Sequence, residues 1–497
     1  MRQIYLKVKG RFTLFGVLAI ACIFAGGCTE DKTDGPDIPE EPQEVPDDTP
    51  QDSTSQQDYA LKKAQKFILN NCFNYYYWHD EMDSIVNSYK LTDFKSISSF
   101  FYATLYPKDR WSWMADGSYF AQSETGEYEG TYGASIRQQI EYYNDYDLHI
   151  AYVYPGSPFD KNGVKRGWTL THIAERPVMD MIRDGSFYDA YDASPQTFTF
   201  TDIEGTPHTF TTETATIETH SSLKTTVFQP SDFPGLTEPV GYFHYLTFNA
   251  NMLDDIHDAM RYLKAANIHK LILDLRYNGG GDSRASELLI DYLAPQSANN
   301  KTFVHRSHNA HHSEEDVISN ISRLPESLDL DALYVIGSSS TASASEMLIN
   351  GLRPYLDLTL VGDTTYGKPN GMYVFMYPND VTSNKQYNNG DYSRLEYVFL
   401  PICFYNKNGI GEVIPDDGFV PDNYRPDDLT HDFNTEEDII KACLTKISTG
   451  EFPELPKPKY YYATTRAGIN KTAILKERRS PFYGLTIEPF PGQQTSE

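Results

Sequence analysis

The chain has 497 residues, 40% hydrophobic residues and a formal net charge of −27 at pH 7. A chain of this length exceeds what one hydrophobic core usually supports, so several domains are expected. The acidic balance excludes a protein that follows a phosphate backbone with a basic surface, and we expect no nucleic-acid partner.

The N-terminus has the pattern of an export signal. Residues 2–11 contain four basic side chains and precede an apolar segment, residues 12–25, which is too short to span a bilayer comfortably. Cys28 follows three small residues, and the arrangement resembles a bacterial lipoprotein signal. We therefore expect a signal peptide over residues 1–27, lipid on Cys28, and anchoring to the outer membrane on its periplasmic or external face. An ordinary signal peptide with an incidental cysteine is the alternative.

Residues 28–57 are expected to be a disordered, acidic, proline-rich tether. Residues 29–57 contain ten acidic side chains, five prolines and one lysine. A segment of this composition cannot bury enough apolar surface to fold.

A helical region is expected next, over residues 58–118. Between Tyr59 and Leu105 apolar residues recur at helical spacing, and Phe67, Ile68 and Cys72 share one face. We interpret this region as a small helical cap.

Residues 119–215 are expected to form a β-rich module. Tyr128–Ile136 is a glycine-punctuated entry into a strand, and Val153–Gly167 is predicted as a strand, a turn and a short helix. The pattern resembles a PDZ domain, although Trp168 replaces the usual aspartate. The resemblance implies that an extended peptide adds as a strand and that the loop Tyr132-Gly133-Ala134 binds it. Ordinary half-buried strands are the alternative.

Two strands are predicted at the centre of the remaining domain, residues 216–450. His269–Leu275 is a continuous apolar run, typical of a strand buried on both faces, and it leads into Gly279-Gly280-Gly281. Glycine lets backbone N–H groups approach a reacting carbonyl closely, so this loop could form half of an oxyanion hole. The spacing of phosphate-binding glycine loops is absent from this segment.

Asp331–Gly337 is the second predicted strand, and Glu346–Leu352 opens an amphipathic helix. Ser343 would then lie at a strand-to-helix turn, where the helix N-terminus favours developing negative charge. A serine nucleophile needs a base, and Lys368 could serve if burial lowers its pKa. The alternative is a structural helix cap in which Glu346 completes a capping box.

Four segments, in this order and spacing, resemble the C-terminal processing peptidases, the tail-specific proteases of serine peptidase family S41. The matching segments are Val240–Phe248, Leu271–Gly281, Thr341–Glu346 and Gly362–Lys368. The resemblance extends over roughly residues 60–445.

The resemblance implies an α/β multidomain protein whose catalytic domain, residues 216–450, has a ClpP/crotonase-like fold. It implies Ser343 as the nucleophile, Lys368 as the general base, and the backbone N–H groups of Gly280 and Ala344 as the oxyanion hole. The function it implies is a serine endopeptidase that cleaves peptides, unfolded proteins or protein C-termini through an acyl-enzyme, without metal or organic cofactor.

Two departures from the family pattern bear on the base. Many members have a glutamine four residues after the lysine, and Met372 occupies that place here. The tricorn-like branch uses a histidine from an earlier segment, where this chain has Trp111. A Ser-Lys dyad is therefore expected, and the third member of any triad is unassigned.

Other functions are less favoured. A catalytically silent binding or scaffolding protein on the same fold is the main alternative. Glycan binding rests only on the aromatic content, and zinc binding by the histidines near His311 and His312 lacks the usual ligand spacing. Cys72, Cys403 and Cys443 are expected to be buried hydrophobic residues.

Further strands are predicted at residues 373–376 and 397–402, and a closing helix at Glu436–Leu444. No structure is predicted for the C-terminal extension, residues 451–497.

Overall fold

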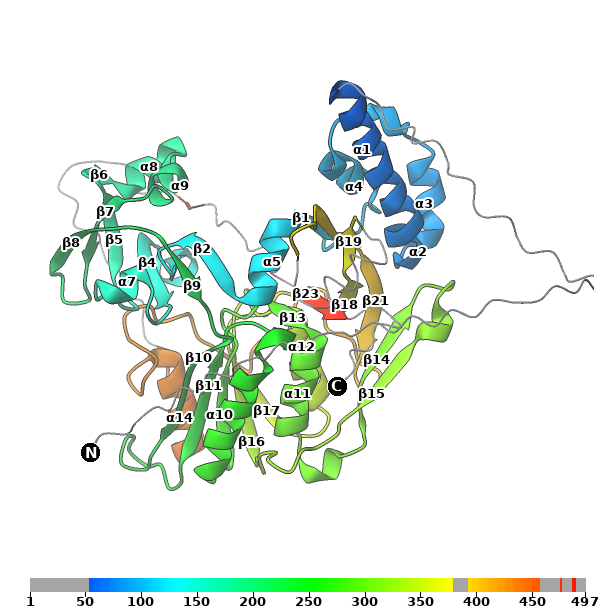
Figure 1. Cartoon of the computed structure of the whole chain (residues 1–497). Coiled ribbons are helices and arrows are strands. Elements are labelled where there is room, and N and C mark those ends of the chain that lie inside the picture. The colour runs from blue at the N-terminus through cyan, green and yellow to red at the C-terminus, as the bar shows by residue number, and fades with distance from the viewer. Residues whose placement is uncertain (1–52, 379–391, 456–473, 476–484, 489–497) are drawn as a thin grey trace, which may run out of the picture. The chain divides into compact units, whose positions relative to one another are not determined.

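The computed structural model describes residues 53–378, 392–455, 474–475 and 485–488 (Figure 1). The predicted signal peptide, Cys28 and all but the last residues of the predicted tether lie outside these ranges. Within them, no helix has the length and apolar character needed to cross a membrane.

A six-stranded sheet forms the centre of the predicted catalytic domain. The strand order is β10-β11-β12-β16-β17-β22, and all neighbours are parallel except the antiparallel pair β10 and β11. The strands are β10 (Ser222–Phe228), β11 (Val240–Tyr245), β12 (Lys270–Asp274), β16 (Ala332–Gly337), β17 (Asp357–Gly362) and β22 (Asn423–Tyr424). The predicted strands near residues 270 and 335 are thereby confirmed as β12 and β16.

Both faces of this sheet are buried, which explains why its strands are continuously apolar. Leu271 and Leu273 of β12 belong to one core with three helices, and Ile272 between them belongs to a core on the opposite face with a fourth helix. The first three helices are α10 (Leu253–Ala265), α11 (Ser283–Leu293) and α12 (Ala344–Leu352), and the fourth is α14 (Asp438–Thr449). The predicted helix at residues 346–352 is part of α12, and the predicted closing helix is α14.

A second six-stranded sheet has the order β13-β23-β18-β21-β14-β15. Its strands come from distant parts of the chain, and the last of them, β23, lies between β13 and β18 (Figure 1). The strands are β13 (Gly280–Asp282), β14 (Thr302–His308), β15 (Val317–Asn320), β18 (Asn370–Tyr373), β21 (Ile402–Lys407) and β23 (Leu485–Glu488). Short 3-10 turns are at Ala250–Met252, Gln296–Ala298 and Ser313–Glu315.

The N-terminal region folds as short helices that pack on a three-stranded sheet. One aromatic-rich core joins Phe100 and Phe101 of the helices to Phe399 and Val398 of the sheet. The helices are α1 (Ser53–Phe67), a π-helical turn (Ile68–Cys72), α2 (Phe73–Tyr75), α3 (His79–Val86), a 3-10 turn (Leu91–Asp93) and α4 (Ile97–Thr104). The sheet has the order β1-β20-β19, formed by β1 (Trp113–Asp116), β20 (Tyr397–Leu400) and β19 (Phe375–Tyr377).

The module of residues 119–215 has a sheet and a core of its own. The strand order is β3-β4-β5-β7-β8, with β6 beside β5 and a separate pair of β2 and β9. Phe159, Phe198 and Phe200 are fully buried in its core. The strands are β2 (Glu127–Thr131), β3 (Ala134–Gln139), β4 (Asp145–Val153), β5 (Thr169–Ile173), β6 (Arg176–Pro177), β7 (Gln196–Thr201), β8 (Pro207–Thr212) and β9 (Ala215–Glu218). The helices are α5 (Gly117–Thr125), α6 (Ile140–Tyr143), α7 (Pro158–Lys161), α8 (Val178–Asp184) and α9 (Phe187–Tyr191).

A buried ion-pair network fastens this module to the central sheet. Arg166 follows α7 and donates to Asp427 Oδ1 at 2.8 Å and to the Tyr277 hydroxyl at 2.7 Å. Arg276, at the end of β12, donates to the same Asp427 oxygen at 2.8 Å and to Glu437 Oε1 at 2.5 Å. The module and the catalytic sheet therefore share a charged network in which Arg166, Arg276 and Glu437 are buried and Asp427 is partly exposed.

Candidate active site

Ser343 lies at the turn between β16 and α12, as the sequence predicted. Its side chain is fully buried, and its backbone has φ 60° and ψ −108°. A residue with a side chain rarely adopts a positive φ, and such strain persists only where surrounding contacts enforce it. The turn therefore fixes the position of this serine at the start of the helix.

Glu346 makes several of the contacts that hold the Ser343 backbone in this conformation. This buried carboxylate accepts the backbone N–H of Ser343 at 2.8 Å and the backbone N–H of Lys368 at 2.9 Å, both on Oε2. Its other oxygen accepts the Thr365 hydroxyl at 2.6 Å and the Gly367 N–H at 2.7 Å. The predicted capping box between Ser343 and Glu346 thus exists, but the same carboxylate also ties the helix to the segment that bears Lys368.

Lys368 is almost completely buried, with 1% of its surface exposed. Burial lowers the pKa of its ammonium group from 10.5 to about 7, against the opposing charges of Asp109 and Glu346. Its Nζ donates to Met372 Sδ at 3.4 Å. Met372 therefore supplies a weak thioether contact to the Lys368 ammonium. Burial of Lys368 favours its neutral amine.

Asp109 is a neighbour of Lys368 that the sequence did not single out. Its carboxylate accepts the Tyr76 hydroxyl at 2.7 Å and the backbone N–H groups of Trp111 and Ser112, both at 2.9 Å. The N-terminal region thus places a carboxylate near Lys368.

The glycine loop after β12 is joined to the serine turn through Asn278. The Asn278 carbonyl accepts the Ala342 N–H at 3.2 Å and the Ser345 hydroxyl at 3.1 Å, and its side-chain oxygen accepts the Gly280 N–H at 2.9 Å. The Gly280 N–H is therefore engaged within the protein in this structure. Gly281 has φ +137°, and an added Cβ there would collide with the Phe248 carbonyl, so only glycine fits this approach.

Ala344 is the first residue of α12. The first N–H groups of a helix have no partner within the helix, so the Ala344 N–H, next to Ser343, is not used by the hydrogen bonds of α12 itself.

A cavity of about 310 Å³ links the module to the glycine loop. It is lined by Gly133 and Ala134 at the module, by Gly279–Gly281 at the catalytic domain, and by aromatic side chains between them. The aromatic residues are Tyr119, Tyr128, Tyr152, Tyr154, Phe248 and Tyr277. Polar side chains also line the cavity, among them Glu124, His220 and Asp282, so it offers both apolar and polar contacts to a ligand.

The three predicted peptide-binding residues of the module, Tyr132, Gly133 and Ala134, lie in different environments. The Tyr132 ring is buried in the module core, and its hydroxyl donates to the Ala193 carbonyl. The Gly133 N–H donates to Thr131 Oγ1 at 3.0 Å, and an added Cβ on Gly133 would collide with Ser157. Gly133 and Ala134 line the cavity, whereas Tyr132 acts through its position in the core.

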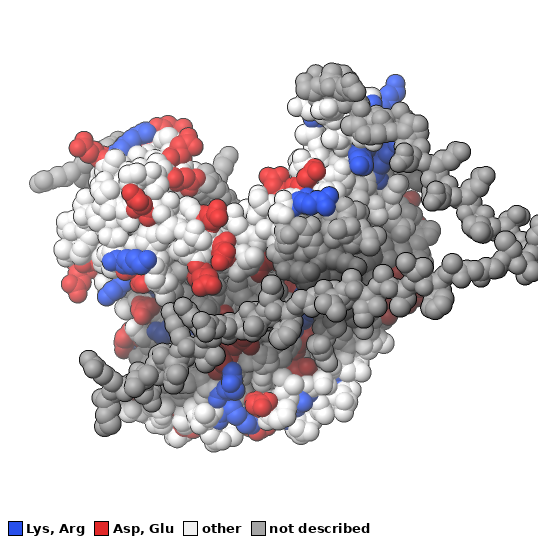
Figure 2. Space-filling view, in the orientation of Figure 1, with Lys and Arg blue, Asp and Glu red and all other residues white. Residues whose placement is uncertain are grey.

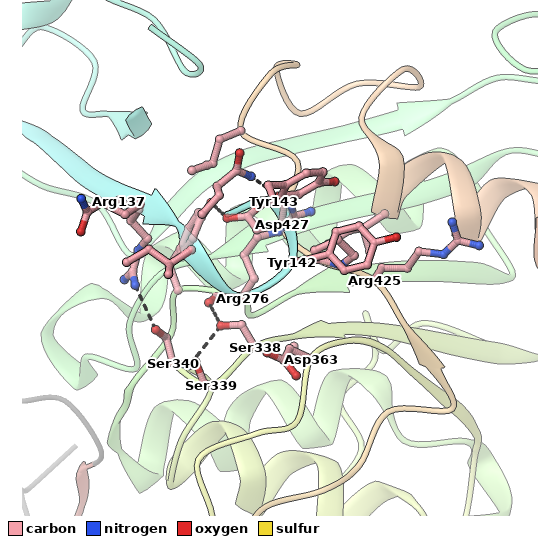
Figure 3. A pocket seen from close by; sticks show the side chains of 18 of the residues that line it. Arg137, Tyr142, Tyr143, Arg276, Ser338, Ser339, Ser340, Asp363, Arg425 and Asp427 are labelled. Atoms are coloured by element: carbon pink, nitrogen blue, oxygen red, sulfur yellow. Dashed lines mark hydrogen bonds and ion pairs between the residues drawn. The ribbon is translucent and has the colours of Figure 1, made fainter. Parts of the chain in front are cut away.

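A second cavity, of about 540 Å³, lies at the carboxyl ends of the central strands (Figure 3). Arg137 of β3 points toward the serines that follow β16, and its Nη1 donates to Ser340 Oγ at 3.3 Å. The Ser338 hydroxyl donates to the Arg276 carbonyl. This cavity combines polar groups of the module and of the catalytic sheet.

The histidines considered for zinc form hydrogen bonds with carboxylates. His311 pairs with Asp80 at 2.9 Å and His312 with Glu315 at 3.0 Å. Cys72, Cys403 and Cys443 are free and buried. This confirms the prediction that they are buried hydrophobic residues.

Known proteins are similar to this chain in the segment that bears this site. The model of Peptidase family S41 matches residues 239–396. A carboxyl-terminal-processing protease of Synechocystis sp. is 32% identical over 131 residues, which are 26% of this chain and 29% of that protein. A protein of the same name from Picosynechococcus sp. is 29% identical over 131 residues, 26% of this chain and 30% of that protein. The chain thus spans less than a third of the length of these curated relatives.

Among solved structures, an S41 protease of Bacteroides fragilis superposes with a TM-score of 0.61 at 21% identity, covering 78% of this chain and 97% of that chain. This likeness shows a shared fold. The segment that matches the model of Peptidase family S41, residues 239–396, includes the turn of Ser343, the glycine loop and Lys368.

Proposed function

We propose that the protein is a serine endopeptidase in which Ser343 is the nucleophile and Lys368 the general base. The observation that supports this most strongly is the shared carboxylate oxygen, Glu346 Oε2, which holds the backbone of both residues. A buried lysine with a pKa of about 7 can accept a proton at neutral pH.

In the proposed reaction, neutral Lys368 takes the proton of the Ser343 hydroxyl while Oγ attacks the carbonyl carbon of the scissile peptide bond. The negative charge that develops on the carbonyl oxygen is stabilised by the N–H groups of Ala344 and Gly280. For Gly280 this requires its N–H to leave Asn278 Oδ1, its partner in this structure.

Collapse of the tetrahedral intermediate breaks the C–N bond. The lysine ammonium returns its proton to the departing amine, and an ester remains on Ser343. Water then attacks the ester carbonyl while Lys368 accepts its proton. The bond between the acyl carbon and Ser343 Oγ breaks, Lys368 returns the proton to Oγ, and the acid product leaves. No step uses a metal or an organic cofactor.

The proposed substrate is an extended peptide, an unfolded protein or the C-terminal region of a protein. The cavity between Gly133 and the glycine loop supports this proposal, as do the names of the curated relatives. We further propose that the module acts as a PDZ-like peptide receptor and that the N-terminal helices act as a cap. The outer edge of β3, the first strand of the module sheet, is suited to pair with an added strand.

A catalytically silent peptide-binding protein is the second candidate. A silent binding protein would have the same cavity. It gives no reason why Ser343, with its strained backbone, and the buried Lys368 are both hydrogen-bonded through their backbone to the Glu346 carboxylate. Burying a lysine without a chemical use is costly, and this favours the peptidase.

Cleavage of casein by a soluble form that starts at Ser53 tests the proposal. Ser343→Ala and Lys368→Ala are expected to lower kcat by at least about 10³-fold, because each removes a partner of the proton transfer. The matched controls are the exposed positions Ser322→Ala and Lys407→Ala, which are expected to retain parental activity. Cleavage that persists in Ser343→Ala would refute the assignment. If the parent binds unfolded peptide but cleaves none, the silent binding protein is the correct description.

A further inference from the structure

The last described segment of the chain forms a strand at the proposed active site. β23 pairs in parallel with β13 on one side and with β18 on the other. Figure 1 shows β23 in red beside these two strands. β13 and β18 make no direct ladder with each other, because β23 lies between them.

The two neighbours of β23 are the strands that bound the proposed reaction centre. The register places Leu485 opposite Gly280 and Thr486 opposite Gly281. On the other side it places Ile487 opposite Met372, whose sulfur contacts Lys368 Nζ at 3.4 Å. β23 thus runs between the proposed oxyanion loop and the residue that contacts the base.

Both edges of β13 are occupied by backbone hydrogen bonds in this structure. The Gly280 carbonyl accepts the Phe248 N–H at 3.0 Å, and the Asp282 N–H donates to the Phe248 carbonyl at 2.8 Å. Phe248 therefore occupies one edge, and β23 occupies the other. An extended substrate that pairs with the glycine loop would have to use the edge that β23 fills.

The same C-terminal extension makes a second, independent contact with the module. Ile474 and Leu475 line the larger cavity beside β3. The Leu475 backbone N–H donates to Gln138 Oε1 at 2.9 Å, and its side chain packs against the module core. Gln138 lies on β3, the edge strand proposed above to receive a peptide.

We propose that β23 is an internal competitor for substrate, bound as a strand where the substrate backbone binds. The proposal rests on the proposed function, because it takes the slot between β13 and β18 as the substrate groove. An intramolecular strand competes at an effective concentration that does not depend on protein concentration. Substrate binding therefore requires β23 to leave the sheet.

Kinetics of the full chain test this inference through β23 alone. Thr486→Pro removes a backbone N–H from a strand that has neighbours on both sides, so it should expel β23, whereas Thr486→Val keeps a strand-forming residue. If β23 fills the groove about 90% of the time, expelling it lowers KM about 10-fold with kcat unchanged. Thr486→Val should match the parent. Equal KM values for Thr486→Pro and Thr486→Val would overturn the proposal.

A binding measurement separates this inference from the proposed chemistry. In the Ser343→Ala background, a labelled synthetic peptide with the sequence of residues 474–488 is titrated into Thr486→Pro and Thr486→Val, and fluorescence anisotropy is read. The peptide should bind the proline variant about 10-fold more tightly, whether or not the parent cleaves anything. Equal affinities, or no binding to either variant, would overturn the proposal. If the parent cleaves no substrate but the peptide affinities of Thr486→Pro and Thr486→Val still differ, only the proposed peptidase activity is refuted.

If the proline variant fails to fold, hydrogen exchange of the unaltered full chain tests the same proposal. The backbone amides of residues 485–488 should exchange slowly, and saturating peptide should accelerate their exchange. Exchange at the rate of an unstructured peptide, or exchange that peptide does not change, would overturn the proposal.

Discussion

Lys368 is surrounded by groups that act on its charge in opposite directions. Burial favours the neutral amine, whereas Asp109 and Glu346 favour the ammonium, and the balance gives a pKa of about 7. Below this pH the proposed base is protonated and cannot accept the Ser343 proton, so kcat/KM should rise with pH through about 7 and then level off.

Asp109→Asn should move this rising limb to lower pH. The substitution keeps an oxygen for the N–H groups of Trp111 and Ser112 but removes the negative charge that raises the pKa of Lys368. A shift of about 0.5 to 1 pH unit is expected. Asp116→Asn, at an exposed position, is the control, and kcat/KM profiles between pH 5 and 9 measure both. An unmoved limb would show that Lys368 is not the titrating base.

Glu346→Gln should impair both stability and chemistry. Each carboxylate oxygen accepts two donors, so the amide nitrogen of glutamine would face two N–H or O–H groups without accepting them. Two buried donors left unsatisfied cost roughly 2 to 6 kcal/mol of unfolding free energy. Urea unfolding measures this loss, with the exposed Glu326→Gln as a control.

A second measurement distinguishes a role of Glu346 in the chemistry of Lys368 from a role in stability alone. Because the anion of Glu346 also raises the pKa of Lys368, the pH limb of the residual Glu346→Gln activity should move to lower pH. A lower kcat with an unmoved limb would reduce Glu346 to a structural residue.

At the scale of elements, charged hydrogen bonds link the module to the catalytic domain. Arg166 is buried on the module, and its guanidinium also donates to the carbonyls of Asp428 and His431 at 2.7 and 2.9 Å. The nearby carboxyl of Asp427 has its pKa held well below the usual range by Arg166 and Arg276, against the effect of burial. One side chain thus links the segment after α7 to the segment before α14.

Arg166→Met should loosen this link. Methionine keeps much of the volume but leaves buried carboxylates with fewer cations, which costs about 3 to 5 kcal/mol. Arg176→Met is the control, because the ion pair of Arg176 with Asp184 is exposed and worth at most about 1 kcal/mol. Urea unfolding and limited proteolysis measure the difference. Equal stability of the two variants would contradict a role of Arg166 in fastening the module.

At the scale of the whole molecule, the acidic charge is divided between the folded part and the predicted tether. On the face in Figure 2, acidic and basic side chains of the described residues are interspersed. Ten acidic side chains lie in residues 29–57 alone. We propose that this segment holds the peptidase away from a membrane to which Cys28 is anchored.

Cys28→Ala tests the anchor. In a bacterial host that processes lipoproteins, the parent should take up labelled palmitate and sediment with membranes, and Cys28→Ala should do neither. Cys72→Ala is the control, since that cysteine is buried in the folded part. Palmitate incorporation that persists in Cys28→Ala would refute lipidation at this position.

Local sequence determined the elements that bear the chemistry. The apolar runs of β12 and β16 are long enough to identify buried strands, and the small residues around Ser343 mark a strand-to-helix turn. These features depend on spacing within a few residues, so one sequence suffices to find them. The position of Met372 relative to Lys368 was visible in the same way.

Only the tertiary structure decided which distant groups meet at the site. Asp109 is more than 250 residues from Lys368 in sequence, and β23 reaches β13 from the far end of the chain. The sequence showed Glu346 as a helix cap, yet its contact with the Lys368 backbone requires the packing of α12 against a later segment. Non-local contacts of this kind are set by packing and burial of the whole domain, whereas local spacing determines only the elements that are packed.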